Sequence, residues 1–337
     1  MDIAVNKTIF EDWKNHTNIE DETLSIVSHF LHLYAYLIIG PMLVLVNIPV
    51  FLTVMIRKAL RTSYLILAIV FLNNALSGMS AIFIGMKRLI ISSLEEHHVV
   101  HHDCLLDVPL FLLTTFLLNG CSLLMNSADR LCVVTFPVYY YIHQKRIIYS
   151  LIATQYAVAL TAVISTALAS LIEPVRYVYH FCILQDVYST HFYVTLTLLS
   201  SITSLFSIIL IIIVVVMLKK KFSEQFLSSH SYNRDLTQFL KNQKRYTYTT
   251  LISCCFTFFL VVVPSIVQNI YMMDSTIKAQ IIVMCCVYLP FFNPLNIVMI
   301  FICRQKDLQR TVIHGFQWTF CKKKNYVHPV VTTGLDE

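Results

Sequence analysis

Seven long apolar stretches divide the chain, and they constrain its fold more than any other feature of the sequence. Each is long enough to reach across a bilayer core, which takes about 20 mostly apolar residues in an α-helix. A backbone in lipid must satisfy its own hydrogen bonds, so the stretches are predicted to be helices. They run from His29 to Ile56, Tyr64 to Met86, Leu105 to Val134, Ile147 to Ile172, His191 to Leu218, Tyr248 to Met273, and Ala279 to Cys303.

The composition agrees with a chain that lies mostly in lipid. Of its 337 residues, 57% are hydrophobic and only 13% are charged, whereas soluble domains are about half apolar and about a quarter charged. The net charge of +6 would favour an acidic partner, such as a nucleic acid, if the basic residues formed one patch. They form separate short clusters between the apolar stretches instead, so we expect contact with membrane lipid and no nucleic acid binding.

The placement of Lys and Arg predicts how the helices are oriented. Basic residues gather after the first, third, fifth and seventh stretches, and cytoplasmic loops are the ones enriched in them. The expected fold is an all-α, seven-transmembrane helix bundle in the plasma membrane, with the N-terminus outside and the C-terminus inside. It comprises an extracellular tail (1–28), the membrane domain (29–303) and a cytoplasmic tail (304–337) that begins with a short amphipathic helix from Arg304 to Trp318.

Two glycosylation sequons support this orientation. Asn6-Lys7-Thr8 and Asn15-His16-Thr17 both lie in the tail that is predicted to be extracellular. Asn-x-Ser/Thr is the acceptor motif for N-glycosylation, which is confined to exposed segments of exported chains. Asn6 and Asn15 are therefore predicted to carry glycans.

Short motifs occupy particular places in the predicted helices: a charged pair ends the third, prolines interrupt the sixth and seventh, and an asparagine lies in the first. They are Asp129-Arg130-Leu131 followed by Pro137 and Tyr140, then Pro264, Asn293-Pro294 and Asn47. Across the whole membrane region this pattern resembles the rhodopsin-like (class A) G-protein-coupled receptors. The Asp-Arg-Leu sequence and the short tails resemble the srsx-type chemosensory receptors of nematodes.

The resemblance implies a switch at the inner end of the third helix. A charge near a membrane face is costly unless it is paired or faces water, so Arg130 is a functional candidate in its own right. In the family, Asp129 pairs with Arg130 at rest, and activation frees Arg130 to meet the G protein. Pro264 kinks its helix and serves as its pivot, an arrangement that Asn293 and Pro294 repeat in the seventh helix. The plainer alternatives are an interfacial anchor and a structural kink.

Several positions depart from the family pattern. Ile297 stands where the seventh-helix motif has a tyrosine, and Asn73 and Asn74 stand where the second helix has an aspartate, so the family's sodium site is not expected. Lys244 occupies the place of the glutamate that locks Arg130 in many relatives. Two cations repel each other, so we expect a weak resting lock and raised basal activity, which Lys244→Glu should lower.

Cysteines and histidines suggest further sites. Only Cys104 and Cys182, of 10 cysteines, fall at positions predicted to face outside, where disulfides persist. The family has a bridge between these places, so the resemblance implies a Cys104–Cys182 disulfide. Cys321 follows the expected amphipathic helix and is a candidate for palmitoylation.

A histidine cluster in the first outer loop suits zinc or a response to acid, although a solvated polar loop is the plainer alternative. Its members are His97, His98, His101 and His102.

Residues on three helices are predicted to line a ligand pocket that opens to the outside. Leu112 stands where amine receptors have a carboxylate, and Val287 stands where opsins have the lysine that binds retinal. Neither an amine nor light is therefore expected, which leaves an apolar small molecule or a peptide. The predicted lining residues are Leu112, Leu113, Phe116, Ser265, Asn269, Tyr271, Val283 and Val287.

These features favour one function. The chain is expected to be a chemosensory G-protein-coupled receptor that transmits binding of an extracellular small molecule to a heterotrimeric G protein, without a cofactor. No hydrolase elbow, phosphate loop or His-Glu-x-x-His motif suggests an enzyme. A transporter would need ionisable groups near the midplane, and the polar groups here are amides and hydroxyls. A neuropeptide-type receptor, a seven-helix protein that no longer couples, and a transporter stay open as alternatives.

Overall fold

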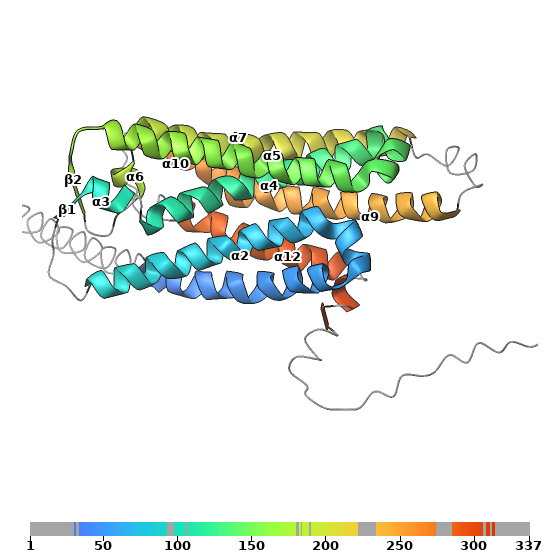
Figure 1. Ribbon diagram of the computed structural model, residues 1–337, viewed down its shortest axis with the longest axis horizontal. Helices are drawn as coiled ribbons and strands as arrows, with labels where there is room; N and C mark the ends of the chain where they lie inside the picture. The colour runs from blue at the N-terminus through green and yellow to red at the C-terminus, as the bar shows by residue number, and fades with distance from the viewer. Residues whose placement is uncertain are drawn as a thin grey trace, which may run out of the picture.

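The structure, a computed structural model, describes residues 30–31, 34–92, 98–105, 107–179, 182, 184–188, 190–221, 234–273, 285–305, 308–310 and 312–313. Within this part of the chain, seven helices are long and apolar enough to cross a membrane, and they lie side by side in one bundle (Figure 1). This confirms the predicted all-α, seven-helix architecture. The spans are Tyr34–Ile56, Tyr64–Ile91, Val108–Thr135, Pro137–Ile172, His191–Lys220, Lys244–Ile270 and Cys285–Arg304.

After the first span come the long helices α2 (Lys58–Ser92), α4 (Val108–Thr135), α5 (Pro137–Ile172), α7 (Thr190–Lys221), α9 (Arg234–Thr257), α10 (Val263–Met273) and α12 (Phe292–Arg304). A π-helix, η1 (Phe258–Val262), joins α9 to α10, and a 3₁₀ turn, η2 (Leu289–Phe291), leads into α12. The short elements are β1 (His98–Val100), α3 (His101–Leu105), β2 (Tyr177–Tyr179) and α6 (Leu184–Val187).

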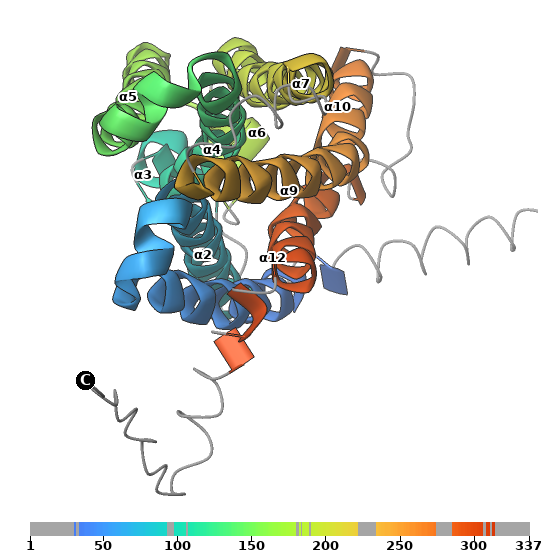
Figure 2. The same cartoon turned by 90° about the vertical axis from the view of Figure 1, so that its right-hand side faces the viewer.

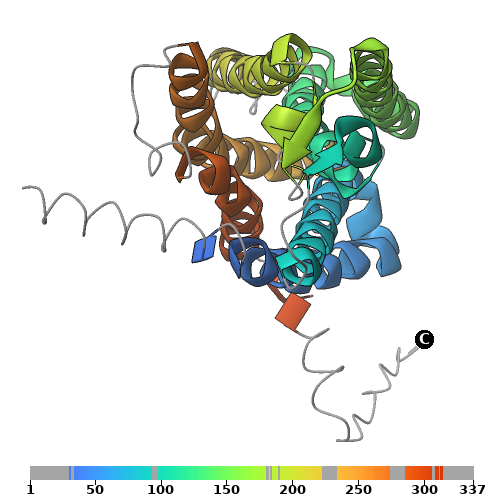
Figure 3. The same cartoon turned by 90° about the vertical axis from the view of Figure 1, so that its left-hand side faces the viewer.

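The short elements gather at one end of the bundle, on the left in Figure 1 and toward the viewer in Figure 3. β1 and β2 pair antiparallel there, with Val99 opposite Val178. We call this the disulfide end. At the opposite end α4 gives way to α5, and α9 passes across the neighbouring helices (Figure 2). We call this the Arg130 end.

Several helices extend beyond their predicted apolar stretches. α2 spans Lys58–Ser92 rather than Tyr64 to Met86. α5 begins at Pro137 rather than Ile147, with one non-helical residue at His143, and α9 begins at Arg234 rather than Tyr248. The sequence prediction measured only the apolar length that a bilayer requires. It could not detect polar turns that continue a helix into water, although proline is favoured at a first helical position.

α4 lies at the centre of the bundle and packs closely against α7. Gly120 makes this approach possible, because a Cβ there would lie 2.9 Å from the Ser200 carbonyl oxygen. Hydroxyls join the two helices elsewhere: Ser127 bonds with Ser207 at 2.7 Å, and Ser207 donates to the Leu123 carbonyl at 2.9 Å. These contacts keep the polar groups of two apolar helices satisfied within the bundle.

α2 carries two buried asparagines, Asn73 and Asn74. Asn73 donates to Ser122 at 2.7 Å and accepts from Tyr156 at 2.8 Å. Asn74 donates to Asn47 of the first span at 3.3 Å. Both are buried, and their partners are neutral, so these amides serve to join α2 to its neighbouring helices.

Candidate functional site

Asp129 and Arg130 lie in the second-to-last turn of α4, which ends at Thr135, and they form a buried ion pair. The Arg130 and Asp129 side chains are 4% and 1% exposed, and Arg130 donates from Nη2 to Asp129. Tyr140 donates its hydroxyl to the second carboxylate oxygen at 2.6 Å. Pro137 begins α5 and so places Tyr140 beside the pair. A buried charge is tolerated when it is paired and hydrogen-bonded, and the structure thus brings these predicted switch residues together.

Tyr246 of α9 covers the ion pair and was not anticipated from the sequence. The Arg130 guanidinium carbon lies 4.1 Å from the centre of the Tyr246 ring, within the range of a cation–π interaction. The Tyr246 hydroxyl donates to Asn126 at 2.9 Å. Lys244 is exposed, so the α9 residue that contacts Arg130 is an aromatic one, two positions beyond the predicted lock position.

α9 is also fastened to the end of α12. Arg245 donates from Nε to the Arg304 carbonyl at 3.0 Å, and Gln305 donates to Thr249 at 3.3 Å. Together with the Tyr246 ring, these bonds close the Arg130 end. In this arrangement Arg130 is 3% exposed, so its guanidinium is closed off from solvent.

A second irregular region lies in the middle of the α9–α10 helix. Pro264, which is buried, follows the π-helix η1. Proline removes a backbone donor and clashes with the preceding turn, and π-turns accommodate such breaks and occur at functional sites. Just before η1, Thr257 donates to the side chain of Asn293 at 2.9 Å. Asn293 and Pro294 are buried on α12, so this break is tied to the seventh span.

A cavity of ≈ 80 Å³ lies between the helices near this break. Four predicted pocket residues line it: Leu113, Phe116, Ser265 and Val287. Leu112 packs instead in a cluster with residues of the first span, α2 and η2, and Asn269 donates to the Ser265 carbonyl of its own helix. The lining is Tyr36, Leu113, Phe116, Leu184, Tyr193, Leu196, Thr197, Ser200, Val261, Ser265, Gln268, Cys286, Val287 and Pro290.

Helix geometry explains why Asn269 does not line the cavity. In a helix with 3.6 residues per turn, the side chains three and four positions beyond Ser265 point to opposite sides of the direction in which the Ser265 side chain points. The cavity lies on the side of Gln268, which sequence reasoning missed for that reason. The side chain of Tyr271, and Val283 as a whole, lie outside the described part of the chain.

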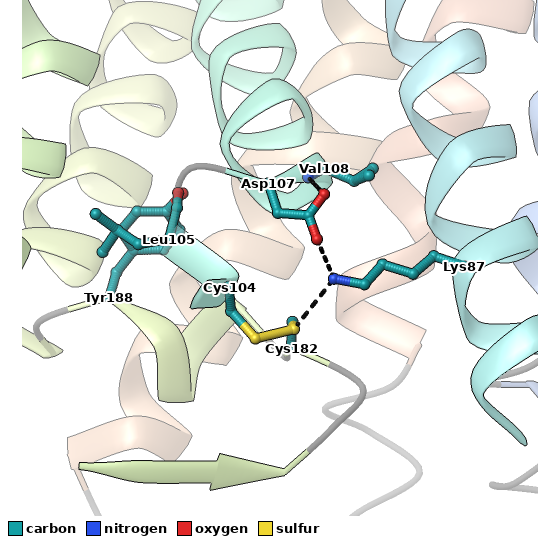
Figure 4. A network of polar contacts seen from close by, with 7 residues as sticks. All are labelled: Lys87, Cys104, Leu105, Asp107, Val108, Cys182 and Tyr188. Carbon is teal, nitrogen blue, oxygen red and sulfur yellow. Dashed lines mark hydrogen bonds and ion pairs between the residues drawn. A yellow bond between two sulfur atoms is a disulfide. The ribbon is translucent and has the colours of Figure 1, made fainter. Parts of the chain in front are cut away.

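The predicted Cys104–Cys182 disulfide is confirmed (Figure 4). Lys87 of α2 pairs with Asp107, which caps the first turn of α4, and its ammonium lies 3.4 Å from the Cys182 sulfur. Tyr188 donates its hydroxyl to the Leu105 carbonyl at 3.0 Å. The bridge and these bonds hold the segment after β2 against α2, α3 and α4.

One histidine of the predicted cluster, His101, has a structural role in the fold. His101 is fully buried; its Nδ1 accepts from the Arg176 backbone at 3.2 Å, and its Nε2 lies 3.4 Å from the Ser170 carbonyl. Among the described residues, no three His, Cys, Asp or Glu side chains form a group that could hold a metal ion. His97 and the side chain of His98 are not part of the described structure, nor are Asn6, Asn15 and Cys321.

Asp107→Asn is expected to remove the ion pair with Lys87 while keeping the helix cap, because Asn caps as well as Asp. Burial by itself raises the pKa of Asp107, but the hydrogen bonds from Lys87 and Val108 and the charge of Lys87 outweigh it and hold this pKa below its ordinary 3.8. The pair therefore stabilises the fold above that value and is lost as the pH falls through the lower folded pKa.

The melting temperature of detergent-solubilised protein checks this expectation. Asp107→Asn should lower it by about 1–2 °C at both pH 7 and pH 5, since partly exposed pairs contribute at most about 1 kcal/mol. The difference should vanish well below pH 3.8. Asp103→Asn, on the exposed side of α3, is the control. An equal effect of both variants at pH 7 would show that the ion pair contributes nothing.

The seven spans define the chain as a multi-pass helical membrane protein. No protein-family model matches the sequence, and no curated protein matches it significantly.

Proposed function

We propose that the chain is a rhodopsin-like G-protein-coupled receptor of the plasma membrane, with the disulfide end outside and the Arg130 end in the cytoplasm. It transmits binding of a small molecule in the cavity to a heterotrimeric G protein, as a chemosensory receptor does. The observation that carries this proposal is the buried Asp129–Arg130–Tyr140 triad under the ring of Tyr246. A charged group that is buried, paired and covered by a separable helix is suited to a switch.

The same helical segment reaches both sites, which gives the proposal a mechanism. α9 carries Tyr246 at the Arg130 end, and its continuation through η1 and α10 carries Val261 and Ser265 in the cavity wall. Pro264 lies in the cavity-lining stretch, between Val261 and Ser265. A ligand that binds better to the arrangement with α9 displaced shifts the population toward it. Arg130 then becomes accessible to the G protein, and the basic residues around it contact anionic lipid.

The proposal is tested by Tyr246→Leu, which removes the aromatic cover and the bond to Asn126. A cation–π contact contributes about 0.5–2 kcal/mol, so ligand-free activation of one G-protein class should rise by about 2- to 30-fold. The measurement is ligand-free activation in cells, scanned across G-protein classes at matched surface expression. Tyr248→Leu, two residues along α9 and away from the guanidinium, is the control. Silence of both wild type and Tyr246→Leu in every class would contradict the proposal.

A further inference from the structure

The wall of the cavity is uncharged. Its described lining residues include no carboxylate, ammonium, guanidinium or imidazole group. The Arg88 guanidinium lies 5.0 Å from the ring centre of the lining residue Tyr36, but Arg88 itself does not line the cavity. Transfer of an unpaired charge into such surroundings is strongly unfavourable. The cavity therefore selects against ligands that are ionised at neutral pH.

The polar groups of the wall are not equivalent. Thr197 donates to the Tyr193 carbonyl at 2.7 Å and Ser200 donates to the Phe116 carbonyl at 3.3 Å, so both hydroxyls are used by the fold. Gln268 is only 8% exposed, and neither its amide nor the Ser265 hydroxyl bonds to another described residue.

Gln268 and Ser265 lie one helical turn apart on α10 and both line the cavity. The amide offers two donors and an acceptor, and the hydroxyl offers one donor and an acceptor. Both groups face the cavity, so a ligand that occupies it must offer them hydrogen-bonding partners or leave their hydrogen-bonding capacity unused, which costs about 1–3 kcal/mol for a buried group. A carbonyl or hydroxyl oxygen of the ligand supplies such a partner, whereas a hydrocarbon does not.

The volume limits the size of the occupant. The free volume is ≈ 80 Å³, and about 10–15 Å³ of such volume accommodates one water. The cavity thus has room for roughly five to eight waters, and covalently bonded atoms pack more closely than waters do. About ten non-hydrogen atoms fit. Peptides and drug-sized ligands, whose sites span about 300–1,000 Å³, would extend beyond this cavity.

We propose that this cavity binds an uncharged molecule of about ten non-hydrogen atoms, with an apolar body and one carbonyl or hydroxyl group held by Gln268 and Ser265. Leu113, Leu196 and Val287 supply apolar surface for the body. This inference rests on the proposed function in one respect: the molecule bound here is the ligand whose binding the proposed receptor transmits. Because Ser265 directly follows Pro264, the ligand contacts the helix at its pivot.

The test uses full-length protein in lipid nanodiscs and four probes of matched chain length: nonan-2-one, nonane, nonan-1-amine and nonanoate. Calorimetric titration at pH 7 should show binding of the ketone and no saturable binding of the other three. Gln268→Leu should raise the Kd of nonan-2-one about tenfold, equivalent to about 1.4 kcal/mol. Asn269→Leu, at the neighbouring residue outside the cavity, should leave it unchanged. Ser265→Ala provides a second variant if Gln268→Leu does not fold.

Three results would overturn the inference: no binding of the ketone, amine or carboxylate binding as tight as ketone binding, or an unchanged Kd in a folded Gln268→Leu or Ser265→Ala variant. The titration contains no G protein, so its outcome is independent of coupling. Ketone binding by a chain that stays silent with Tyr246→Leu would contradict the proposed function and leave this inference standing.

Discussion

Arg130→Ala is expected to abolish G-protein activation, including the raised ligand-free activity of Tyr246→Leu. In the proposed mechanism, displacement of Tyr246 matters only because it uncovers the guanidinium of Arg130. The double variant Arg130→Ala/Tyr246→Leu should therefore be as silent as Arg130→Ala alone, which is a loss of the entire signal. Activation in cells at matched surface expression measures this. Arg146→Ala, which removes an exposed cation from the same end of the bundle, is the control and should keep most of the activity.

Folding must be separated from coupling in this experiment. Loss of one partner from a buried ion pair costs about 3–5 kcal/mol, so Arg130→Ala will reach the surface at a lower level and needs higher expression to match wild type. Arg130→Lys keeps the charge but lacks the planar guanidinium, and it should fold better while activating weakly. Full activity of the double variant at matched surface level would show that Arg130 is not the residue that meets the G protein.

The spans could be predicted from the sequence because bilayer thickness imposes a length and a composition on each helix. The Cys104–Cys182 bridge followed from a family resemblance and was confirmed. Lys244 illustrates the limit of that approach. The resemblance directed attention to the position of a carboxylate lock, and a charge was weighed only against other charges. No sequence motif marks Tyr246, two residues after Lys244, as the aromatic residue that covers Arg130.

Gln268 shows a second limit. Sequence alone places Gln268 and Asn269 on neighbouring directions of one helix, and only the packing of α10 in the bundle, which includes its contact with α7, decides which of the two meets the cavity. The irregular turn η1 adds to this uncertainty, because the run of apolar residues from Phe258 to Val263 is compatible with either an α- or a π-helical turn. Residue-level prediction of a pocket therefore depends on tertiary contacts that periodicity does not contain.

Removal of the disulfide by Cys104→Ser/Cys182→Ser should be the most damaging change at the opposite end. The bridge closes a loop of 78 residues, and the chain-entropy relation assigns such a loop about 4.5 kcal/mol of stabilisation. We expect the melting temperature in detergent to fall by about 10 °C. Reductant should lower the wild type by a similar amount and leave the variant unchanged. Cys255→Ser/Cys285→Ser, at two exposed free cysteines, is the control, and an equal fall in that variant would assign the effect to cysteine loss in general.

The bridge should also affect ligand binding. Leu184, two residues beyond Cys182, lines the cavity, and Tyr188 fastens the same segment to α3 through the Leu105 carbonyl. Without the bridge, this segment must be ordered each time a ligand binds, and the cost of ordering reduces affinity. The Kd of nonan-2-one should therefore rise in the double serine variant even at temperatures well below its melting point. An unchanged Kd would mean that the Tyr188 and Arg176 bonds alone keep Leu184 in the cavity wall, and that the bridge contributes to stability without shaping the site.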